Sequence, residues 1–289
     1  MTESASTSKM HAQGPTGLLD GFSLEMTGRD IPELERAAPL IPAGTQINVT
    51  FLATENLDLR VAAARAVLSA GAVPVPHIAA RRISSAEELD CTLAALQEAG
   101  AAQRVFVVGG DPSRPMGAYS SSRDVIESDL LAKHHVQQVS IAGYPEGHPD
   151  IDRDTLWREL EAKSALLKKQ GLRGEIITQF GFDEKPIIEW VHEVRERGIS
   201  TPIRIGVPGP AGVKRLVGFA RRFGISANAS IVKKYGFSLG NLMGTAGPDR
   251  LISALERDID SRQLGEVRLH FYTFGGVETT AKWISSFRG

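Results

Sequence analysis

The chain has 289 residues, 42% of them hydrophobic, so it can bury a sizeable core. Its 33 Lys and Arg residues balance 34 Asp and Glu residues, which argues against a protein that holds nucleic acid by bulk charge. The single cysteine, Cys91, excludes an intramolecular disulfide and a thiolate-rich metal site.

The N-terminal segment, residues 1–20, lacks the apolar core of a signal peptide, and its Ser, Thr, Gly and Gln content predicts a flexible tail. No apolar run approaches the roughly 18 residues that a membrane-spanning helix requires. We therefore expect a cytoplasmic protein with no membrane partner, in which Cys91 is a buried, inert thiol within a helix. The sequence leaves open whether the chain forms a homo-oligomer.

Eight short apolar runs, rich in β-branched residues, follow the tail and are predicted to be strands. Several of them are apolar on both faces, as parallel strands covered by helices are. The predicted strands span residues 22–26, 47–52, 73–79, 104–108, 138–144, 175–182, 202–207 and 268–274.

Helical spacing of apolar residues predicts helices between most of these strands. One begins with Ser85 followed by Glu88, a capping-box pattern, and ends before Gly100. The predicted helices span residues 57–70, 85–96, 154–170, 186–197, 213–223 and 248–260.

The alternation of strand and helix predicts right-handed βαβ units and a parallel sheet. Eight such units in about 250 residues indicate a closed (β/α)8 TIM barrel, formed as a single α/β domain over residues 21–289. An open, doubly wound sheet is the alternative. It usually carries a glycine fingerprint after its first strand, and residues 25–28 do not contain one.

Polar side chains stand near the ends of seven predicted strands, where barrels of this kind place their chemistry. A buried polar group without a hydrogen-bond partner costs about 1–3 kcal/mol, so their recurrence predicts a pocket. No metal-ligand motif occurs, and no metal site is predicted. The residues at the strand ends are Glu25, Thr50, His77, Asp111, Tyr144, Glu146, His148, Gln179, Asp183, His270, Tyr272 and Thr273.

Individually these residues have structural alternatives. Glu25 could pair with Arg29 at the barrel edge, and His77 could be a core histidine with satisfied hydrogen bonds. The Gly-Gly-Asp-Pro segment at 109–112 could be only a turn, since these residues favour turns, although its glycines also allow a ligand to approach the backbone.

The order of short motifs adds a further signal. They are Ser-Leu-Glu at 23–25, Asn-Val-Thr-Phe at 48–51, Pro-His-Ile at 76–78, Gly-Gly-Asp at 109–111, Ala-Gly-Tyr-Pro-Glu-Gly-His-Pro at 142–149, Ile-Thr-Gln-Phe-Gly-Phe-Asp at 177–183 and His-Phe-Tyr-Thr at 270–273. This set resembles the bacterial 5,10-methylenetetrahydrofolate reductase family from about residue 22 to the end of the chain. The family is a (β/α)8 barrel that holds FAD, in agreement with the fold predicted from periodicity.

The resemblance implies an enzyme of one-carbon metabolism and methionine biosynthesis with a folate as its small-molecule partner. In the family, NADH or NADPH reduces FAD, and the flavin passes a hydride to methylenetetrahydrofolate to give 5-methyltetrahydrofolate. Glu25 matches the family's general acid, which protonates N10, and Asp111 matches the aspartate that stabilises the cationic iminium. We expect burial to raise the pKa of Glu25 so that it can donate a proton near neutral pH.

Other residues match binding positions of the family. Glu25, Asp111, Gln179 and Tyr272 are the expected contacts to the folate. The expected contacts to FAD are Thr50, His77, Gly110, Asp111, Tyr144, His148 and Lys163.

Four departures from the family pattern affect the cofactor site. An aromatic and proline-rich first strand is replaced by Leu-Glu-Met-Thr-Gly-Arg at 24–29, Gly109 replaces an arginine, Leu156 replaces an acidic residue, and Gly275-Gly276 replaces Asn-Arg. Each lost charge-assisted hydrogen bond is worth about 1.5–3 kcal/mol. The alternatives are therefore a folate oxidoreductase that binds FAD weakly or not at all, one that oxidises the methyl group, or a non-catalytic folate-binding barrel. A phosphate-binding barrel is disfavoured because the prolines within residues 206–210 remove N–H donors.

Overall fold

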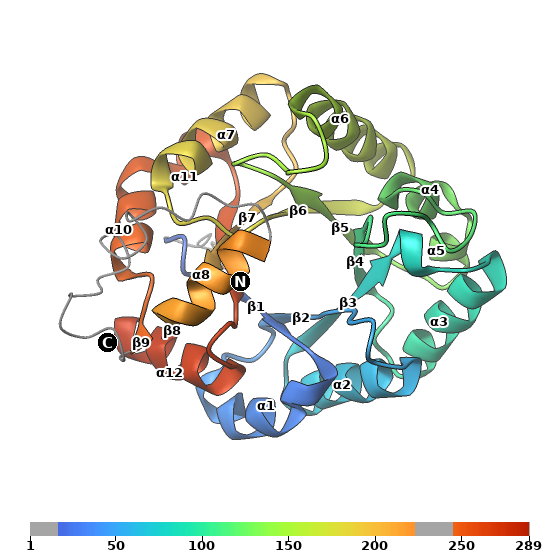
Figure 1. The fold of residues 1–289 in the computed structure, drawn as a ribbon, viewed down its shortest axis with the longest axis horizontal. Coiled ribbons are helices and arrows are strands. Elements are labelled where there is room, and N and C mark those ends of the chain that lie inside the picture. Colours follow the sequence, from blue (N-terminus) through green and yellow to red (C-terminus); the bar gives the residue numbers. More distant parts are fainter. Residues whose placement is uncertain (1–16, 223–244, 289) are drawn as a thin grey trace, which may run out of the picture.

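The computed structural model describes residues 17–222 and 245–288. Eight parallel strands close into a barrel in the order β1-β10-β7-β6-β5-β4-β3-β2, and helices surround it (Figure 1). Because β1 pairs with both β2 and β10, the sheet has no edge, and the open-sheet alternative is excluded. The expected single (β/α)8 barrel is confirmed.

The barrel strands match the predicted ones to within a few residues at each end. The largest difference is at β6, which ends at Thr178 rather than at 182, because the chain turns across the barrel mouth and Gly181 N donates to Gly206 O. The strands are β1 (Ser23–Met26), β2 (Gln46–Val49), β3 (Val73–Ala79), β4 (Arg104–Val108), β5 (Gln138–Gly143), β6 (Arg173–Thr178), β7 (Ile203–Pro208) and β10 (Val267–Tyr272).

The predicted helices appear as α2 (Leu57–Ser69), α3 (Ala86–Glu98), α6 (Arg153–Lys169), α7 (Glu184–Glu196), α8 (Val213–Arg222) and α10 (Asp249–Asp258). Residue 223, the predicted end of the fifth helix, lies outside the described residues. Side-chain caps determine several starts: Asn56 Oδ1 accepts from Leu59 N at 2.9 Å, and Asp152 Oδ1 accepts from Thr155 N at 2.8 Å.

Several short elements were not predicted because they span too few residues to display a helical period. They are α1 (Ile31–Ala37), α4 (Ser122–Glu127), α5 (Leu130–Lys133) and α11 (Ser261–Leu264), with 3-10 turns η1 (Gly28–Asp30), η2 (Ala38–Leu40) and η3 (Ala80–Arg82). The C-terminal α12 (Val277–Arg288) was also missed. A two-stranded antiparallel pair, β8 (Ala211–Gly212) with β9 (Thr245–Ala246), lies outside the barrel sheet.

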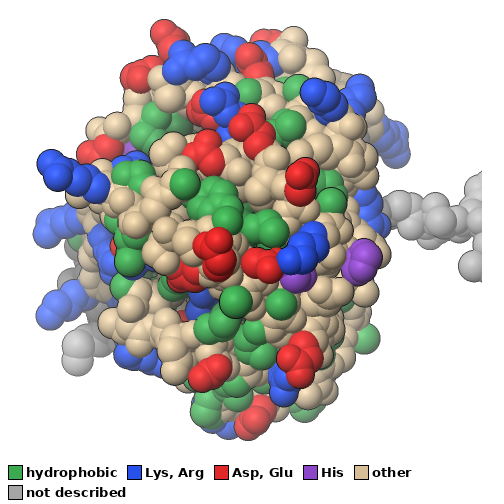
Figure 2. Space-filling view, turned by 90° about the vertical axis from the view of Figure 1, so that its right-hand side faces the viewer, with side chains coloured by type: hydrophobic (Ala, Val, Ile, Leu, Met, Phe, Trp, Pro, Cys, Tyr) green, Lys and Arg blue, Asp and Glu red, His purple; other side chains and the backbone are tan. Residues whose placement is uncertain are grey.

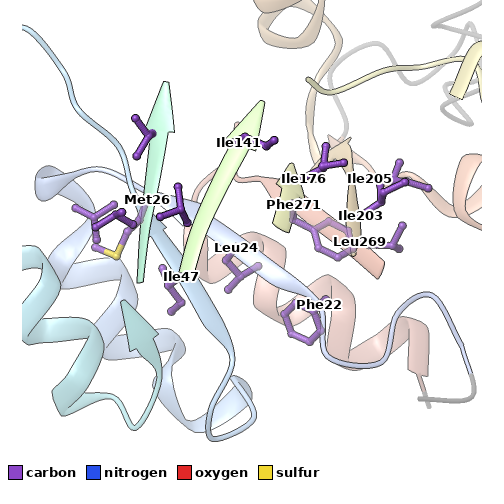
Figure 3. Packing of buried hydrophobic residues seen from close by; sticks show 14 of the residues in the cluster. Phe22, Leu24, Met26, Ile47, Ile141, Ile176, Ile203, Ile205, Leu269 and Phe271 are labelled. Atoms are coloured by element: carbon purple, nitrogen blue, oxygen red, sulfur yellow. The ribbon is translucent and has the colours of Figure 1, made fainter. Parts of the chain in front are cut away.

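The main hydrophobic core lies between the strands and the surrounding helices. In β1, Leu24 and Met26 belong to this core together with Ile47 of β2 (Figure 3). Because side chains alternate along a strand, Ser23 and Glu25 point to the other side, into the barrel. The alternation therefore assigns the apolar residues of β1 to the core and its polar residues to the interior.

The barrel interior is polar at its N-terminal end. Arg204 of β7 and Glu175 of β6 form an ion pair there with an Nε–Oε1 distance of 2.6 Å, although both are almost completely buried. Ser140 Oγ donates to Glu175, and Arg204 Nη1 donates to Gly21 O. Each buried charge requires its partner, so this network favours the alignment of β5, β6 and β7 that brings these side chains together.

Two expectations about individual segments were wrong. Leu18 and Leu19, assigned to the flexible tail, are buried, and Leu18 O accepts a hydrogen bond from Leu269 N. Residues 1–16 lie outside the described residues. Cys91 lies on α3 as expected but is exposed, because the buried face of that helix is formed by Leu89, Leu93 and Leu96.

The face of the molecule that carries α3, α4 and α5 displays basic and acidic side chains intermixed (Figure 2). None of the helices in residues 17–222 and 245–288 is both long and apolar enough to cross a membrane.

Candidate active site

The barrel mouth at the C-terminal ends of β1, β2, β3 and β10 gathers polar side chains. The register of the sheet explains the grouping, because Ser23 is aligned with His270 and Glu25 with Asn48. Residues two apart on one strand share a face, so Glu25 follows Ser23 into the barrel. This end of the barrel is where (β/α)8 proteins carry their chemistry.

Glu25 lies inside this group rather than at the barrel edge. Its side chain is 19% exposed, and its Oε2 atom lies 3.6 Å from Nε2 of His270. Burial by itself raises the pKa of the Glu25 carboxyl, but the contact with His270 and the nearby His77 outweigh burial, and the pKa lies below its ordinary value. The expected rise in pKa was therefore wrong for the unliganded site. The sequence indicated the burial of the carboxyl but not the two imidazoles around it.

His77 lies on the floor of the mouth. Asn48 Nδ2 lies 3.4 Å from His77 Nε2, and the imidazole packs edge-on against Phe106 with ring centroids 4.7 Å apart. Burial lowers the pKa of His77 to about 4, so the ring is neutral near pH 7. The alternative that His77 is a core histidine with satisfied hydrogen bonds is met in part, because its Nε2 atom faces the Asn48 amide.

Three buried polar atoms at the mouth make no hydrogen bond of normal length to the described residues. They are Asn48 Oδ1, Thr50 Oγ1 and His270 Nε2. Buried polar groups in native proteins are usually satisfied, and a ligand is one of the partners that can satisfy them. Thr50 and His270 also face Glu25, so Asn48 Oδ1 is the atom of the three that is available to a polar heterocycle such as a pterin.

Tyr272 and Gln179 stand on the opposite side of the mouth. The Tyr272 hydroxyl donates to Thr178 O at 3.0 Å, and burial, with the nearby Glu25 and Tyr144, raises the pKa of this phenol well above its ordinary value. Gln179 Oε1 accepts from Phe180 N at 3.1 Å. The Gln179 Nε2 group, which the described residues leave without a partner, can donate to a ligand.

An aromatic wall continues from Tyr272 toward α8. Phe180 contacts both Tyr272 and Phe274, with ring centroids 5.3 and 4.8 Å apart, and Phe219 of α8 stacks on Phe274 at 4.1 Å. Arg215 Nη1 donates to Phe274 O and so ties α8 to the loop after β10. Flat aromatic rings bind well against walls of this kind.

Asp111 lies apart from the buried group around Glu25. Its side chain is 69% exposed, and it accepts from Nε and Nη2 of Arg82 at 2.9 and 2.5 Å. The neighbouring Gly110 has a φ of +92°, a conformation that favours glycine. The structure thus places Asp111 on a loop at the rim, with its charge compensated.

Tyr144 and His148 border a cavity of about 860 Å³ beside β5, α6 and α7. Their rings meet edge-on with centroids 5.3 Å apart. Leu156, one of the departures from the family pattern, also lines this cavity. Its charged lining residues are Glu146, Asp150, Asp152 and Arg153, and Arg153 pairs with Glu193 at 2.6 Å.

Lys163 does not line this cavity. Its side chain is buried between α6 and α4, where Nζ donates to Ser122 Oγ at 3.3 Å, and burial lowers its pKa. The structure thus does not bring Lys163 to the other expected cofactor residues.

These positions test whether the site fits FAD. Of the expected flavin contacts, Tyr144 and His148 line the cavity beside β5, whereas Thr50 and His77 do not. The diphosphate of FAD fits less well, because three carboxylates line the cavity beside Tyr144 and its one arginine is already paired. Like charges in a confined space repel. The described residues around this cavity therefore do not fit the diphosphate of FAD.

The loop after β10 contains another departure, Gly275-Gly276. A Cβ atom at Gly275 would lie 1.9 Å from Pro210 O, so only glycine allows this loop to approach the end of β7. Gly276, which stands in place of the family's arginine, has a φ of +104°, a conformation that favours glycine, so this replacement is part of the same tight loop.

Two further polar residues inside the barrel, Ser23 and Asn48, were not among the predicted site residues. Both are fully buried and polar. The available signal was their spacing: each stands two residues before a predicted site residue, Glu25 and Thr50, and so on the same face of its strand.

The family model and the curated relatives agree on one family. The family model described as methylenetetrahydrofolate reductase matches residues 32–285. A probable methylenetetrahydrofolate reductase (NADH) of Oryza sativa subsp. japonica is 29% identical over 185 residues, 54% of this chain and 30% of the relative. Methylenetetrahydrofolate reductase 2 of Saccharomyces cerevisiae is 29% identical over 128 residues, 42% of this chain and 20% of the relative. The matches thus cover less than a third of these curated relatives.

A solved structure of dihydropteroate synthase from Thermus thermophilus is similar with a TM-score of 0.48 and 14% identity, over 93% of this chain and 94% of that one.

Proposed function

Because the chain belongs to the methylenetetrahydrofolate reductase family, we propose that it interconverts 5,10-methylenetetrahydrofolate and 5-methyltetrahydrofolate by hydride transfer. The observation that carries this proposal is the position of Glu25. A carboxyl inside the barrel mouth, aligned with Asn48, whose buried Oδ1 atom makes no hydrogen bond to the described residues, is suited to receive a pterin and to exchange a proton with it.

Glu25 is the proposed general acid. It gives its proton to N10 as the bond between N10 and the bridging carbon breaks, and the bond's electron pair stays on N10. The remaining N5 iminium accepts the hydride. A bound folate would exclude water from the exposed part of Glu25 and so add to the burial that raises its pKa.

The other residues hold and orient the substrate in this proposal. Gln179 Nε2 donates to the pterin, and Tyr272 lies beside it as a neutral phenol because its pKa is far above 7. Asp111 contributes negative charge at the rim near the cationic iminium, reduced by its pairing with Arg82.

The hydride carrier has two candidates. The family resemblance supports FAD, reduced by NADH or NADPH, and when bound it supplies a two-electron relay. A folate oxidoreductase without tightly held FAD is favoured by the acidic cavity beside Tyr144 and by the burial of Lys163 against Ser122. The rice and maize relatives are named as NADH enzymes, which supports NADH as the reductant in either case.

The proposed function is tested with Glu25→Gln. We expect turnover of methylenetetrahydrofolate with NADH to fall about 100-fold or more, since general acid catalysis contributes 10²–10⁴, while the folate Kd changes little. Glu98→Gln, at an exposed position on α3, is the matched control. A wild-type protein that binds folate but turns none over, with or without added FAD, would be a binding module instead.

The visible spectrum of the purified protein, before and after addition of FAD, distinguishes the enzyme that uses FAD from the one that holds no FAD tightly. Flavin absorbance that survives gel filtration, with turnover that depends on it, supports the FAD candidate. A colourless protein that turns over with NADH alone supports the other.

A further inference from the structure

Ser23, His270 and Glu25 form a continuous line of polar atoms inside the barrel. Ser23 Oγ lies 2.8 Å from His270 Nδ1, and His270 Nε2 lies 3.6 Å from Glu25 Oε2. Ser23 and His270 are completely buried, and Glu25 is 19% exposed. The line therefore begins in the barrel interior and ends at the mouth.

The two contacts select one tautomer of His270. If Nδ1 carried the proton and donated to Ser23, the bare Nε2 lone pair would face the Glu25 carboxylate, which is repulsive. If instead the Ser23 hydroxyl donates to Nδ1, Nε2–H points at the carboxylate and attracts it. The second arrangement uses both contacts favourably.

We propose that Ser23 and His270 are positioning residues for Glu25: Ser23 holds the His270 tautomer, and His270 orients Glu25 and stabilises the carboxylate that remains after proton transfer. This inference rests on the proposed function, because it assigns a task to the general acid. In the proton-transfer step Glu25 loses its proton to N10, and the negative charge formed on Oε2 lies against the Nε2–H donor.

The line does not supply the proton itself. Ser23 is fully buried, and neither it nor His270 reaches solvent, so a proton leaving Glu25 cannot be replaced through them. Reprotonation must come from the mouth, where Glu25 retains its exposed fraction. In this proposal His270 is therefore a hydrogen-bond donor to Glu25 and not a source of the transferred proton.

The other titratable groups facing Glu25 do not replace His270. His77, from β3, is neutral near pH 7, since burial lowers its pKa to about 4. Tyr272, from β10, stays protonated because its pKa is far above 7, and its hydroxyl donates to Thr178 O. Thr50 adds a hydroxyl but no charge.

The test compares His270→Gln, which keeps an N–H donor near the position of Nε2, with His270→Leu, which removes it. The reaction needs protonated Glu25, so kcat/KM falls as pH rises through the pKa of this carboxyl. Without the donor that pKa rises, and we expect the midpoint of this fall to move up by about one pH unit or more in His270→Leu. The plateau kcat of His270→Leu should be about tenfold lower than that of the wild type. In His270→Gln, both the pH midpoint and the plateau kcat should lie close to the wild-type values.

Ser23→Ala provides a second test that preserves the imidazole. Without the Ser23 hydroxyl, His270 is no longer held in one tautomer. The midpoint of the fall in kcat/KM should therefore move to higher pH, by a smaller amount than in His270→Leu. His192→Gln, at an exposed position on α7, is the histidine control and should leave the profile unchanged. If His270→Leu fails to fold, as judged by circular dichroism and folate affinity, Ser23→Ala and His270→Gln still test whether Ser23 and His270 position Glu25.

A direct measurement separates this inference from the proposed function. Carbon-13 NMR of the glutamate carboxyls, with Glu25 assigned by Glu25→Gln, reports its pKa without turnover. An unchanged Glu25 pKa in folded His270→Leu and Ser23→Ala would overturn the inference. A wild-type protein with no folate turnover but a shifted Glu25 pKa in these variants would overturn the proposed function and leave the contact of His270 with Glu25 established.

Discussion

Arg204 and Glu175 form an ion pair inside the barrel, with 2% and 6% of their side chains exposed and 2.6 Å between Nε and Oε1. They come from the neighbouring strands β7 and β6, and Ser140 of β5 and Gly21 before β1 provide additional hydrogen bonds. The N-terminal end of the barrel is thus stabilised by two buried, opposite charges that compensate each other.

Glu175→Gln is expected to destabilise the fold by about 3–5 kcal/mol, because it leaves the buried Arg204 charge without a counter-ion. Urea unfolding followed by circular dichroism measures the change. Glu278→Gln is the matched control, since its partner Arg36 is largely exposed and solvent screens that pair. Equal effects of the two substitutions would contradict the importance of burial.

Asp111→Asn is expected to lower turnover about tenfold at saturating folate, because it removes negative charge near the iminium from a position that solvent partly screens. Arg82→Gln removes the compensating cation instead, and turnover should not fall. Steady-state kinetics at low ionic strength compare the two. A similar loss in both variants would mean that the ion pair only supports the rim loop.

Lys163→Met is expected to leave FAD and folate titrations within twofold of the wild type, because Nζ is buried against Ser122 and does not line the cavity. The thermal midpoint should be at least as high as that of the wild type, since it is costly to bury an ammonium whose hydrogen bond is to a neutral hydroxyl. Flavin fluorescence and calorimetry measure these quantities, with exposed Lys168→Met as control. A tenfold weaker FAD titration would place this lysine at the cofactor.

His77 makes stability depend on pH. Its folded pKa of about 4 lies below the ordinary value of 6.5, so the unfolded chain binds more protons between these values. The free energy of unfolding should therefore fall by about 3 kcal/mol from this group as pH decreases from 7 to 4. Denaturant unfolding of His77→Gln should lack this part of the decrease, whereas His192→Gln should retain it. Parallel curves for wild type and His77→Gln would disprove the assignment.

The periodicity of apolar residues was enough to predict the closed barrel. Strand periods and helical periods are local properties, and each of the eight strand predictions overlaps an observed strand. Short helices such as α4 and α5 were missed for the same reason, because they contain too little sequence to repeat a period. The exposure of Cys91 was predictable from the positions of Leu89, Leu93 and Leu96, but the usual burial of cysteine was given more weight.

The sequence by itself determined the fold, the family and which polar residues stand at the strand ends, since these follow from local pattern and motif order. Only the tertiary structure decided which of them meet. Ser23 and His270 are 247 residues apart and touch because the barrel closes between β1 and β10. The direction of the Glu25 pKa, the exposure of Asp111 and the burial of Lys163 likewise depend on neighbours from other strands and helices, because electrostatic energies are set by distance in space and by solvent access.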